Sequence, residues 1–387
     1  GCGIKLNGKN QMIRLPWFKG LMGVFEFDKL ILEWREKYNN NDIGKVKDIY
    51  GKEYNIIDDD IEFIFTKSQF KMWKYYESWE DYKKQFKLYN CEACTCNIEE
   101  DYIKDAKINY QMLQTLSDIK PQEMTRLAQK MIDDITNLGN DYRTMMRILG
   151  INENNPNQSA MQKSLQIYPE LMHDKYNRQI LKDCKKSLVK DGKSAKFPIK
   201  GKYTFVLPDL YAFCEWLFLD KENPKGILES NEVSCSLYKD GIELDCLRSP
   251  HLYREHAIRI NKRNELTDRW FNGKAIYTST QDFISKILQF DVDGDKLLVV
   301  SDKLLCRIAK RNMKDIVPLY YDMKKAPSQI INKETLYDGL DKAYKGGKIG
   351  IYSNNISKIW NSGKITQEQL DIVKMLCMEN NFCIDMA

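Results

Sequence analysis

The pattern of apolar and polar residues divides the chain into four regions. In residues 1–72, glycines separate short apolar runs and the segment 61–66 alternates at period two, which predicts strands and turns. From about residue 73 to 190, apolar residues recur at three- and four-residue spacing, as Met124, Leu127 and Met131 do, which predicts helices. Pro121 fits the start of one helix, and Gly139 fits its end.

The second half repeats this order. Residues 195–302 are predicted to form strands, the last of which is the apolar run 296–300. The segments 304–325, 333–344 and 367–379 have the spacing of helices. Strand-rich and helical regions that alternate in this way predict an α+β fold and disfavour a βαβ nucleotide-binding fold.

The composition is that of a globular protein with room for two or three domains. The chain has 387 residues, 43% hydrophobic and 30% charged, which excludes general disorder. The net charge of +5 is the difference between 60 basic and 55 acidic residues, so partners must be inferred from local clusters. There is no long apolar run or signal peptide, and the 11 cysteines are scattered. We therefore expect a cytoplasmic protein that does not enter a membrane.

The most informative segment is an acidic loop, Asp-Val-Asp-Gly-Asp, which contains Asp291, Asp293 and Asp295. On a straight strand, alternate residues lie about 6.6 Å apart, and on a helix they point in different directions. Two oxygens bound to one Mg²⁺ lie no more than about 4.2 Å apart. The carboxylates therefore converge only through a tight turn, for which Gly294 supplies the freedom. The apolar flanks 287–290 and 297–300 are expected to be buried strands.

Three crowded carboxylates repel one another. At 4–5 Å and an effective dielectric near 20, each pair costs roughly 3–4 kcal/mol, a penalty that a divalent cation removes. A calcium EF-hand is excluded, because it requires glycine at its sixth position, where Lys296 stands. The other acidic run, residues 58–60, is expected to be a solvated turn. The sequence thus predicts a magnesium site at the acidic loop.

A segment upstream of the loop, residues 246–256, resembles a motif of cellular RNA polymerases. It is similar to the Asn-Arg-x-Pro-Thr-Leu-His-Arg segment that precedes Asp-Phe-Asp-Gly-Asp in their β′ subunit. The match is carried by Arg248, Pro250, Leu252 and Arg254. In that family, the arginine that matches Arg248 contacts the sugar of the incoming nucleotide. A planar guanidinium with several donors suits this role.

Two lysines have matches in related enzymes. Residues 11–21 resemble the Lys-Gly segment of the partner barrel, in which Lys19 would match the lysine that reaches the substrate phosphates. The segment 66–72 resembles the Pro-Ser-x-x-Lys-Phe segment of RNA-silencing polymerases, which makes Lys71 a second candidate. Cellular enzymes have a further lysine eight residues before the Lys-Gly pair. This chain has Gln11 there, so the role of that position is open.

Together these segments resemble the YonO-like single-chain RNA polymerases of phages, which contain two double-psi β-barrels. The resemblance implies a first barrel in 1–72, incomplete at its N-terminus, and a helical connector in 73–190. The second barrel, with the acidic loop, would occupy 191–303, and a truncated helical region would follow in 304–387. Its first helix matches the bridge helix in position. The basic residues of that helix would approach phosphates or form a solvated face: Arg307, Lys310, Arg311 and Lys314.

The implied activity is template-directed RNA synthesis by Mg²⁺-dependent nucleotidyl transfer from nucleoside triphosphates to an RNA 3′ end. If the protein is encoded by a phage, this takes place in the bacterial host. The acidic loop would hold one Mg²⁺, and a second would arrive with the triphosphate. Lys19 and Lys71 would neutralise the phosphates, and Arg248 would position the sugar. The expected partners are the template, the nascent RNA and nucleoside triphosphates.

Two alternatives are open at this point. Residues 248–254 favour a DNA template, whereas the segment around Lys71 favours an RNA template, as in enzymes that amplify silencing RNA. An inactive nucleic-acid-binding relative is the alternative from another class, and the intact acidic loop argues against it. Zinc at Cys91, Cys94 and Cys96 would need a fourth ligand. For His251 and His256, ordinary polar roles are expected.

Overall fold

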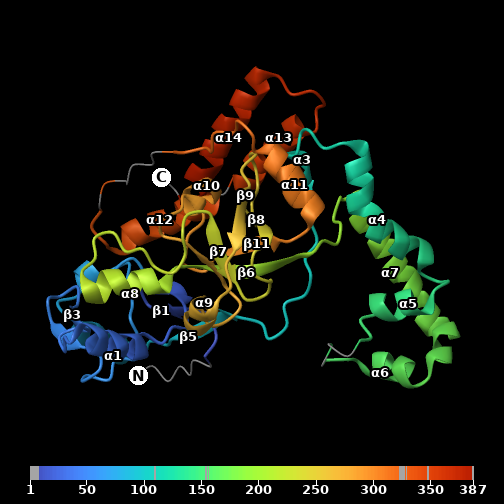
Figure 1. The fold of residues 1–387 in the computed structure, drawn as a ribbon. Helices are drawn as coiled ribbons and strands as arrows, with labels where there is room; N and C mark the ends of the chain where they lie inside the picture. The colour runs from blue at the N-terminus through green and yellow to red at the C-terminus, as the bar shows by residue number, and fades with distance from the viewer. Residues whose placement is uncertain are drawn as a thin grey trace. The chain divides into compact units, whose positions relative to one another are not determined.

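The computed structural model describes residues 8–108, 110–152, 155, 157–321, 327, 329–346 and 348–385. The chain divides into two compact units (Figure 1). The first comprises Gly1–Lys104, Lys202–Ser249 and Glu255–Cys306, and the second comprises Asp105–Gly201, Pro250–Arg254 and Arg307–Ala387. Both of the predicted β-rich regions contribute to the first unit.

Six strands of the first unit form a closed barrel, in the order β10-β6-β11-β8-β9-β7. Strands β10 and β6, and strands β7 and β9, pair in parallel, whereas β8 is antiparallel to both β9 and β11. Alternate side chains such as Leu297 and Val299 fill the core. The predicted last strand is confirmed. The strands are β6 (Gly201–Pro208), β7 (Glu232–Cys235), β8 (Glu243–Arg248), β9 (Ala257–Asn261), β10 (Ile276–Thr278) and β11 (Lys296–Val300).

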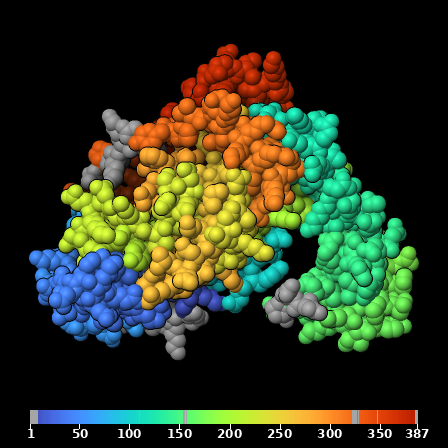
Figure 2. All heavy atoms as spheres, viewed as in Figure 1, coloured from blue at the N-terminus to red at the C-terminus, as the bar shows by residue number. Residues whose placement is uncertain are grey.

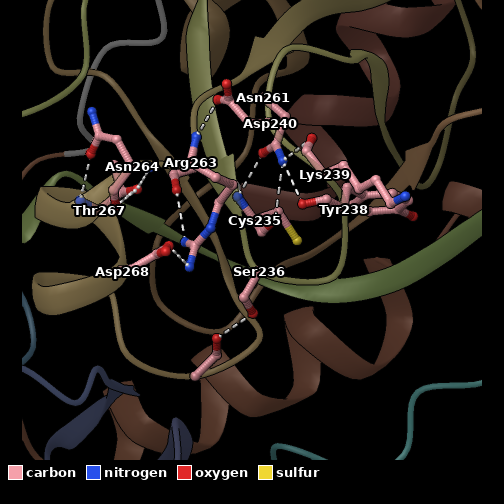
Figure 3. A network of polar contacts seen from close by, with 12 residues as sticks. Cys235, Ser236, Tyr238, Lys239, Asp240, Asn261, Arg263, Asn264, Thr267 and Asp268 are labelled. Atoms are coloured by element: carbon pink, nitrogen blue, oxygen red, sulfur yellow. Dashed lines mark hydrogen bonds and ion pairs between the residues drawn. The ribbon is translucent and has the colours of Figure 1, made fainter.

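One buried asparagine fixes the turn between β7 and β8 (Figure 3). The side-chain amide of Asn261 donates to the carbonyls of Cys235 and Tyr238, at 3.2 and 2.9 Å. Its side-chain oxygen accepts a hydrogen bond of 2.8 Å from the backbone N–H of Cys235. The backbone N–H of Arg263 then donates to Asp240 at 2.7 Å. These bonds satisfy polar groups at a corner where the barrel strands change direction.

The N-terminal part of the first unit packs against the outside of this barrel. Figure 2 shows its blue atoms directly against yellow and orange atoms of the barrel region. A three-stranded sheet has the order β2-β1-β5, and β3 and β4 form a separate pair. The elements of this N-terminal part are β1 (Gln11–Leu15), β2 (Phe18–Met22), α1 (Phe27–Tyr38), β3 (Lys45–Lys47), β4 (Glu53–Asn55), η1 (Trp73–Tyr75), α2 (Trp79–Leu88) and β5 (Cys94–Ile98). Among the described residues there is one closed barrel, so a barrel is confirmed for the second β-rich region and not for the first.

Two predictions for the N-terminal region are wrong. The segment 61–66 is not a strand, because Ile61 and Ile64 pack into one core cluster and Phe65 into another. Its apolar residues therefore do not alternate between a buried and an exposed face. The region also contains the helix α1, which buries Leu30 and Trp34 at four-residue spacing. The strand β5 lies beyond residue 72 but pairs with β1, so the first unit extends to Lys104.

The barrel is covered by short helices of the same unit. The helix α8 (Leu210–Leu219) begins at Asp209, whose buried carboxylate accepts backbone hydrogen bonds from Tyr211 and Ala212. The same carboxylate accepts two more, from Ile227 and Leu228, and so fixes the loop before β7. Two further short helices are α9 (Glu265–Trp270) and α10 (Ile284–Leu288).

The second unit is helical, and its described residues include two of its apolar cores. One joins the α4–α7 region, in which α4 lies beside α7 (Figure 1), and the other joins α13 and α14 to residues 252–253. Pro121 is at the start of α4, as predicted. The helices are α3 (Tyr110–Gln114), α4 (Pro121–Asn137), α5 (Tyr142–Ile148), α6 (Ala160–Ile167), η2 (Pro169–His173), α7 (Lys175–Lys193), α12 (Lys333–Gly346), α13 (Ile349–Trp360) and α14 (Gln367–Asp385). No helix in the described ranges has the length and apolar character needed to cross a bilayer.

The helix α11 (Lys303–Asn312) is shorter than the predicted segment 304–325, of which residues 322–326 lie outside the described ranges. Asp315 has a φ of +62°, outside the helical range, and Pro318 follows, so the helix does not continue through this segment. Near its end, Arg311 pairs with Asp118 and Glu123. The hydrogen bonds from Arg311 lower the pKa of Glu123 to about 2. Arg311 is therefore engaged by carboxylates of its own unit.

Candidate active site

The acidic loop connects α10 to the barrel strand β11 and forms the predicted tight turn. Residues 292–294 make the turn, and Gly294 has a φ of +132°, which side-chain-bearing residues rarely adopt. The upstream flank is the helix α10 and not the expected strand. Its apolar residues Ile284, Ile287 and Leu288 are spaced for one helix face, and all three join the barrel core. The downstream flank is a strand, as expected.

The glycine of the loop also allows a close approach to β1. A Cβ atom built on Gly294 would lie 2.6 Å from the Sδ atom of Met12. Met12 is buried, and its partner across the hairpin is Leu21 on β2. The β1–β2 hairpin, which carries Lys19, therefore packs against the acidic loop.

Lys19 reaches the acidic loop directly. It lies on β2, opposite Arg14 of β1, and its Nζ atom is 2.6 Å from Oδ2 of Asp293. The two side chains are 38% and 33% exposed, so solvent and incoming ligands have access to both. The structure therefore brings together two residues that the sequence analysis assigned to one site from opposite ends of the chain.

Arg248 approaches the loop from the end of β8. It is opposite Leu297 in the β8–β11 pair, and its Nε atom is 3.0 Å from Oδ2 of Asp295. The guanidinium also donates to the carbonyl of Gln289, at the end of α10. Asp295 in turn accepts a hydrogen bond of 3.1 Å from the backbone N–H of Asp291, which closes the loop on itself. Arg248 is thus in contact with both ends of the loop.

Two of the three loop carboxylates form ion pairs with basic side chains. Within the described part of the chain, no three His, Cys, Asp or Glu side chains are gathered into a group that could hold a metal ion. Asp293 is paired with Lys19, Asp295 is paired with Arg248, and Asp291 is exposed. The donor set nevertheless suits Mg²⁺, because it offers hard carboxylate oxygens on an accessible turn that already attracts positive charge. The magnesium site stays a prediction.

Lys71 lies on a segment that pairs with the strand of Lys19, although the two lysines are far apart in sequence. The segment 66–72 runs along β2, with backbone hydrogen bonds from Lys19 to Gln69 (3.1 Å) and from Lys71 to Trp17 (2.9 Å). Phe18 forms a bridge with Phe70, and their rings stack with centroids 4.2 Å apart on the buried side. The residue after each phenylalanine is a lysine whose side chain is accessible.

Gln69 joins the two lysine-bearing segments, a role that sequence reasoning did not find. Its side chain lies over Gly20, where a Cβ atom would be 2.4 Å from Nε2. Nε2 donates to the carbonyl of Leu21 at 3.2 Å, and Oε1 accepts from the N–H of Thr66 at 2.9 Å. The glycine of the Lys-Gly pair is therefore needed for this close approach.

A buried ion pair anchors the other end of the loop region, and it was also missed. Arg259 of β9 contacts Asp282 through two nitrogens, at 2.5 and 2.8 Å. The side chains are only 9% and 4% exposed, and Asp282 also accepts from the N–H of Ile284 at 3.1 Å. A bidentate pair of this kind fixes orientation. It holds the start of α10, and hence the approach to the acidic loop, on the barrel.

The remaining candidates have structural surroundings. His251 is 3.1 Å from the hydroxyl of Thr115, and His256 is 2.8 Å from the carboxylate of Asp245, in line with ordinary polar roles. Gln11 is buried in β1, with 1% of its surface exposed. The three cysteines considered for zinc are free thiols that form no metal-binding group in the described structure: Cys91, Cys94 and Cys96.

We expect Gly294→Ala to reduce catalysis strongly. The substitution forces either a strained φ, at a cost of about 1–3 kcal/mol, or a displaced loop, and a shift of about 1 Å can cost about a hundredfold in rate. Steady-state nucleotide incorporation measures the effect. Gly241→Ala is the matched control, because that glycine also has a positive φ (+72°) but nothing within 4 Å of an added Cβ. Equal activity in the two variants would contradict the role given to Gly294.

Known RNA polymerases resemble this chain in sequence and in fold. No protein-family model matches the chain. Over 391 aligned residues, which include the whole chain, it is 53% identical to the DNA-directed RNA polymerase YonO of Bacillus phage SPbeta. The chain spans 45% of the length of that relative.

A solved structure shows the same fold. The RNA-dependent RNA polymerase QDE-1 from Thielavia terrestris matches with a TM-score of 0.57 over 98% of this chain and 42% of that chain. The sequences are only 14% identical, so this similarity concerns the fold alone. The resemblance inferred from the acidic loop and residues 246–256 is thus confirmed, since the chain is similar over its whole length to the YonO polymerase of phage SPbeta.

Proposed function

We propose that this chain carries the catalytic centre of a template-directed RNA polymerase, which adds nucleotides from nucleoside triphosphates to an RNA 3′ end. The observation that carries the proposal is the meeting of Lys19 and Arg248, from opposite halves of the sequence, on two aspartates of one turn. The 53% identity to a phage polymerase supports it. The proposal includes a double-psi type for the closed barrel and a further barrel, the first along the chain, to which β1, β2 and β5 belong.

Asp291, Asp293 and Asp295 would hold Mg²⁺, which, with a second ion brought by the triphosphate, would supply charge stabilisation for the attacking and leaving oxygens. The protein's own groups bind and orient the substrate. Lys19 and Lys71 present two ammonium groups on one side of the β2 region, where they neutralise the phosphates. Arg248 is fixed at both ends of the loop and positions the sugar through its guanidinium donors. No side-chain nucleophile is required.

We propose DNA as the template. The polymerase with 53% identity is named as DNA-directed, whereas the RNA-dependent enzyme is similar in fold alone. An RNA template is the second candidate, because Lys71, whose segment resembles that of silencing polymerases, lies on the segment that pairs with the strand of Lys19. The partners would be the template, the nascent RNA and nucleoside triphosphates, in the cytoplasm of a bacterial host.

Extension of a labelled RNA primer tests the proposal. The 387-residue chain is incubated with Mg²⁺, four ribonucleotides and the primer annealed to DNA or to RNA of the same sequence. Extension on DNA, lost when Mg²⁺ is chelated and restored when it is added back, is the expected result. Faster extension on RNA would favour the second candidate. Binding of both templates without extension on either would identify an inactive nucleic-acid-binding relative and overturn the proposal.

A further inference from the structure

The helix α7 carries a line of positive charge that the chemistry proposed above does not use. It contains seven basic and two acidic residues, a surplus equal to the whole chain's net charge of +5. Lys186 contacts Asp183 at 3.3 Å, but the other six form no ion pair with any described residue. All seven are exposed: Lys175, Arg178, Lys182, Lys185, Lys186, Lys190 and Lys193.

These residues share one face of the helix. Their spacing of mostly three and four residues places them within an arc of about 140°, whose centre lies about 130° round the helix from the buried residues Asn177 and Leu181. The buried face is fixed, because Leu188 packs into the α4–α7 core and Gly192 allows close contact with Met131 of α4. The basic face is therefore held towards solvent. From Lys175 to Lys193 it extends for about 27 Å, at 1.5 Å per residue.

Helix stability does not account for this arrangement. Lysines in the last turn, such as Lys190 and Lys193, are favourable for the helix dipole. Lys175 and Arg178 occupy the first turn, where the dipole makes positive charge unfavourable. Like charges three and four residues apart also repel along the whole face. Basic residues that destabilise the first turn of their own helix are explained by a partner of opposite charge.

We propose that the basic face of α7 binds the phosphate backbone of double-stranded DNA, an inference that rests on the proposed function. A DNA duplex presents one negative charge per about 1.7 Å of its axis, a linear array that complements a straight basic face. Single strands are bound by aromatic side chains on which bases stack. The basic face contains none, since Tyr176 lies at its edge. Its contacts are therefore with phosphates and independent of sequence.

Binding of a labelled DNA duplex over a salt series tests this inference. The variant combines Lys182→Gln, Lys185→Gln, Lys190→Gln and Lys193→Gln, because glutamine preserves helix propensity while removing charge. The matched control removes four exposed lysines scattered over three other segments of the same unit. It combines Lys333→Gln, Lys342→Gln, Lys358→Gln and Lys364→Gln. Far-UV circular dichroism and thermal melting verify that both are folded.

We expect the α7 variant to bind the duplex at least about tenfold more weakly, with a slope of log K against log salt reduced by about 3–4, and the control to change that slope by less than about 1. Equal losses in the two variants overturn the proposal, as does a loss confined to single strands or to double-stranded RNA. If the fourfold variant does not fold, Lys182→Gln with Lys185→Gln is expected to give about half the slope change.

The two proposals fail separately. Asp293→Asn is expected to bind the duplex as the unmodified chain does, because α7 is intact. A chain that extends no primer but loses duplex binding in the α7 variant would refute the proposed function and support the surface. A chain that extends primers, and whose duplex binding is unchanged by the α7 substitutions, would support the proposed function and refute the binding surface.

Discussion

Asp293→Asn is expected to abolish nucleotide incorporation while leaving the fold intact. Asparagine keeps the size of the side chain but removes the charge that would hold Mg²⁺, and loss of one preorganised electrostatic contact commonly costs a factor of about 10²–10³ in kcat. We expect a loss of at least that size in single-turnover primer extension. Among the described residues, the ion pair with Lys19 is the one polar contact of this carboxylate, and it is solvent-accessible. Its removal should change the free energy of unfolding by no more than about 1 kcal/mol.

Asp60→Asn is the matched control for this experiment. Asp60 belongs to the other acidic run, is exposed, and has a φ of +50°, which asparagine also tolerates. Its substitution should leave both activity and melting temperature unchanged. Normal activity in Asp293→Asn would refute the catalytic role of the loop. A large loss of stability would mean that the carboxylate acts through folding.

Lys19→Met is expected to raise the KM for the triphosphate and to lower the Mg²⁺ concentration that the enzyme requires. Without the ammonium, the triphosphate loses a phosphate contact, so its KM should rise by about tenfold, roughly 1.4 kcal/mol. The same substitution removes a positive charge 2.6 Å from Asp293. Because that charge competes with a divalent cation for the carboxylate, the Mg²⁺ concentration for half-maximal rate should fall by a few-fold. Titrations of triphosphate and of Mg²⁺ measure the two effects.

Lys71→Met distinguishes the two lysines. Its side chain is exposed, and it forms no ion pair with an aspartate of the loop in the described part of the chain. We therefore expect a higher KM for the triphosphate with an unchanged Mg²⁺ requirement. If Lys19→Met instead raised the Mg²⁺ requirement, Lys19 would assist metal binding, and the competition described here would be wrong.

The parts of the site that could be predicted are those determined by local chemistry. The turn at Gly294 follows from the spacing of three carboxylates, and β11 follows from an uninterrupted apolar run. The helix α1 was missed, although Leu30, Ile31 and Trp34 have helical spacing and are buried on one side. The glycines near it favoured strands and obscured that signal.

The parts that could not be predicted depend on contacts between distant segments. Nothing in the spacing of residues 66–72 indicates that they pair with β2. The backbone hydrogen bonds of Lys19 and Lys71 join the two segments, so neither segment predicts them by itself. The same is true of Arg259 and Asp282, because an isolated charge in a sequence is usually solvated. Resemblance identified Lys19 and Arg248, and the fold alone brought them to one turn.

The strand order has a consequence for how the protein associates with itself. A closed barrel has no edge strand and offers no unpaired backbone to a second molecule. The three-stranded sheet is open, but residues 66–72 hydrogen-bond to the outer side of β2 and cover that edge. The other edge is β5, which carries the exposed thiol of Cys94 and, within the described residues, has no strand on its far side. Wherever no further strand pairs with this edge, aggregation and oxidative cross-linking of the purified protein should begin at β5.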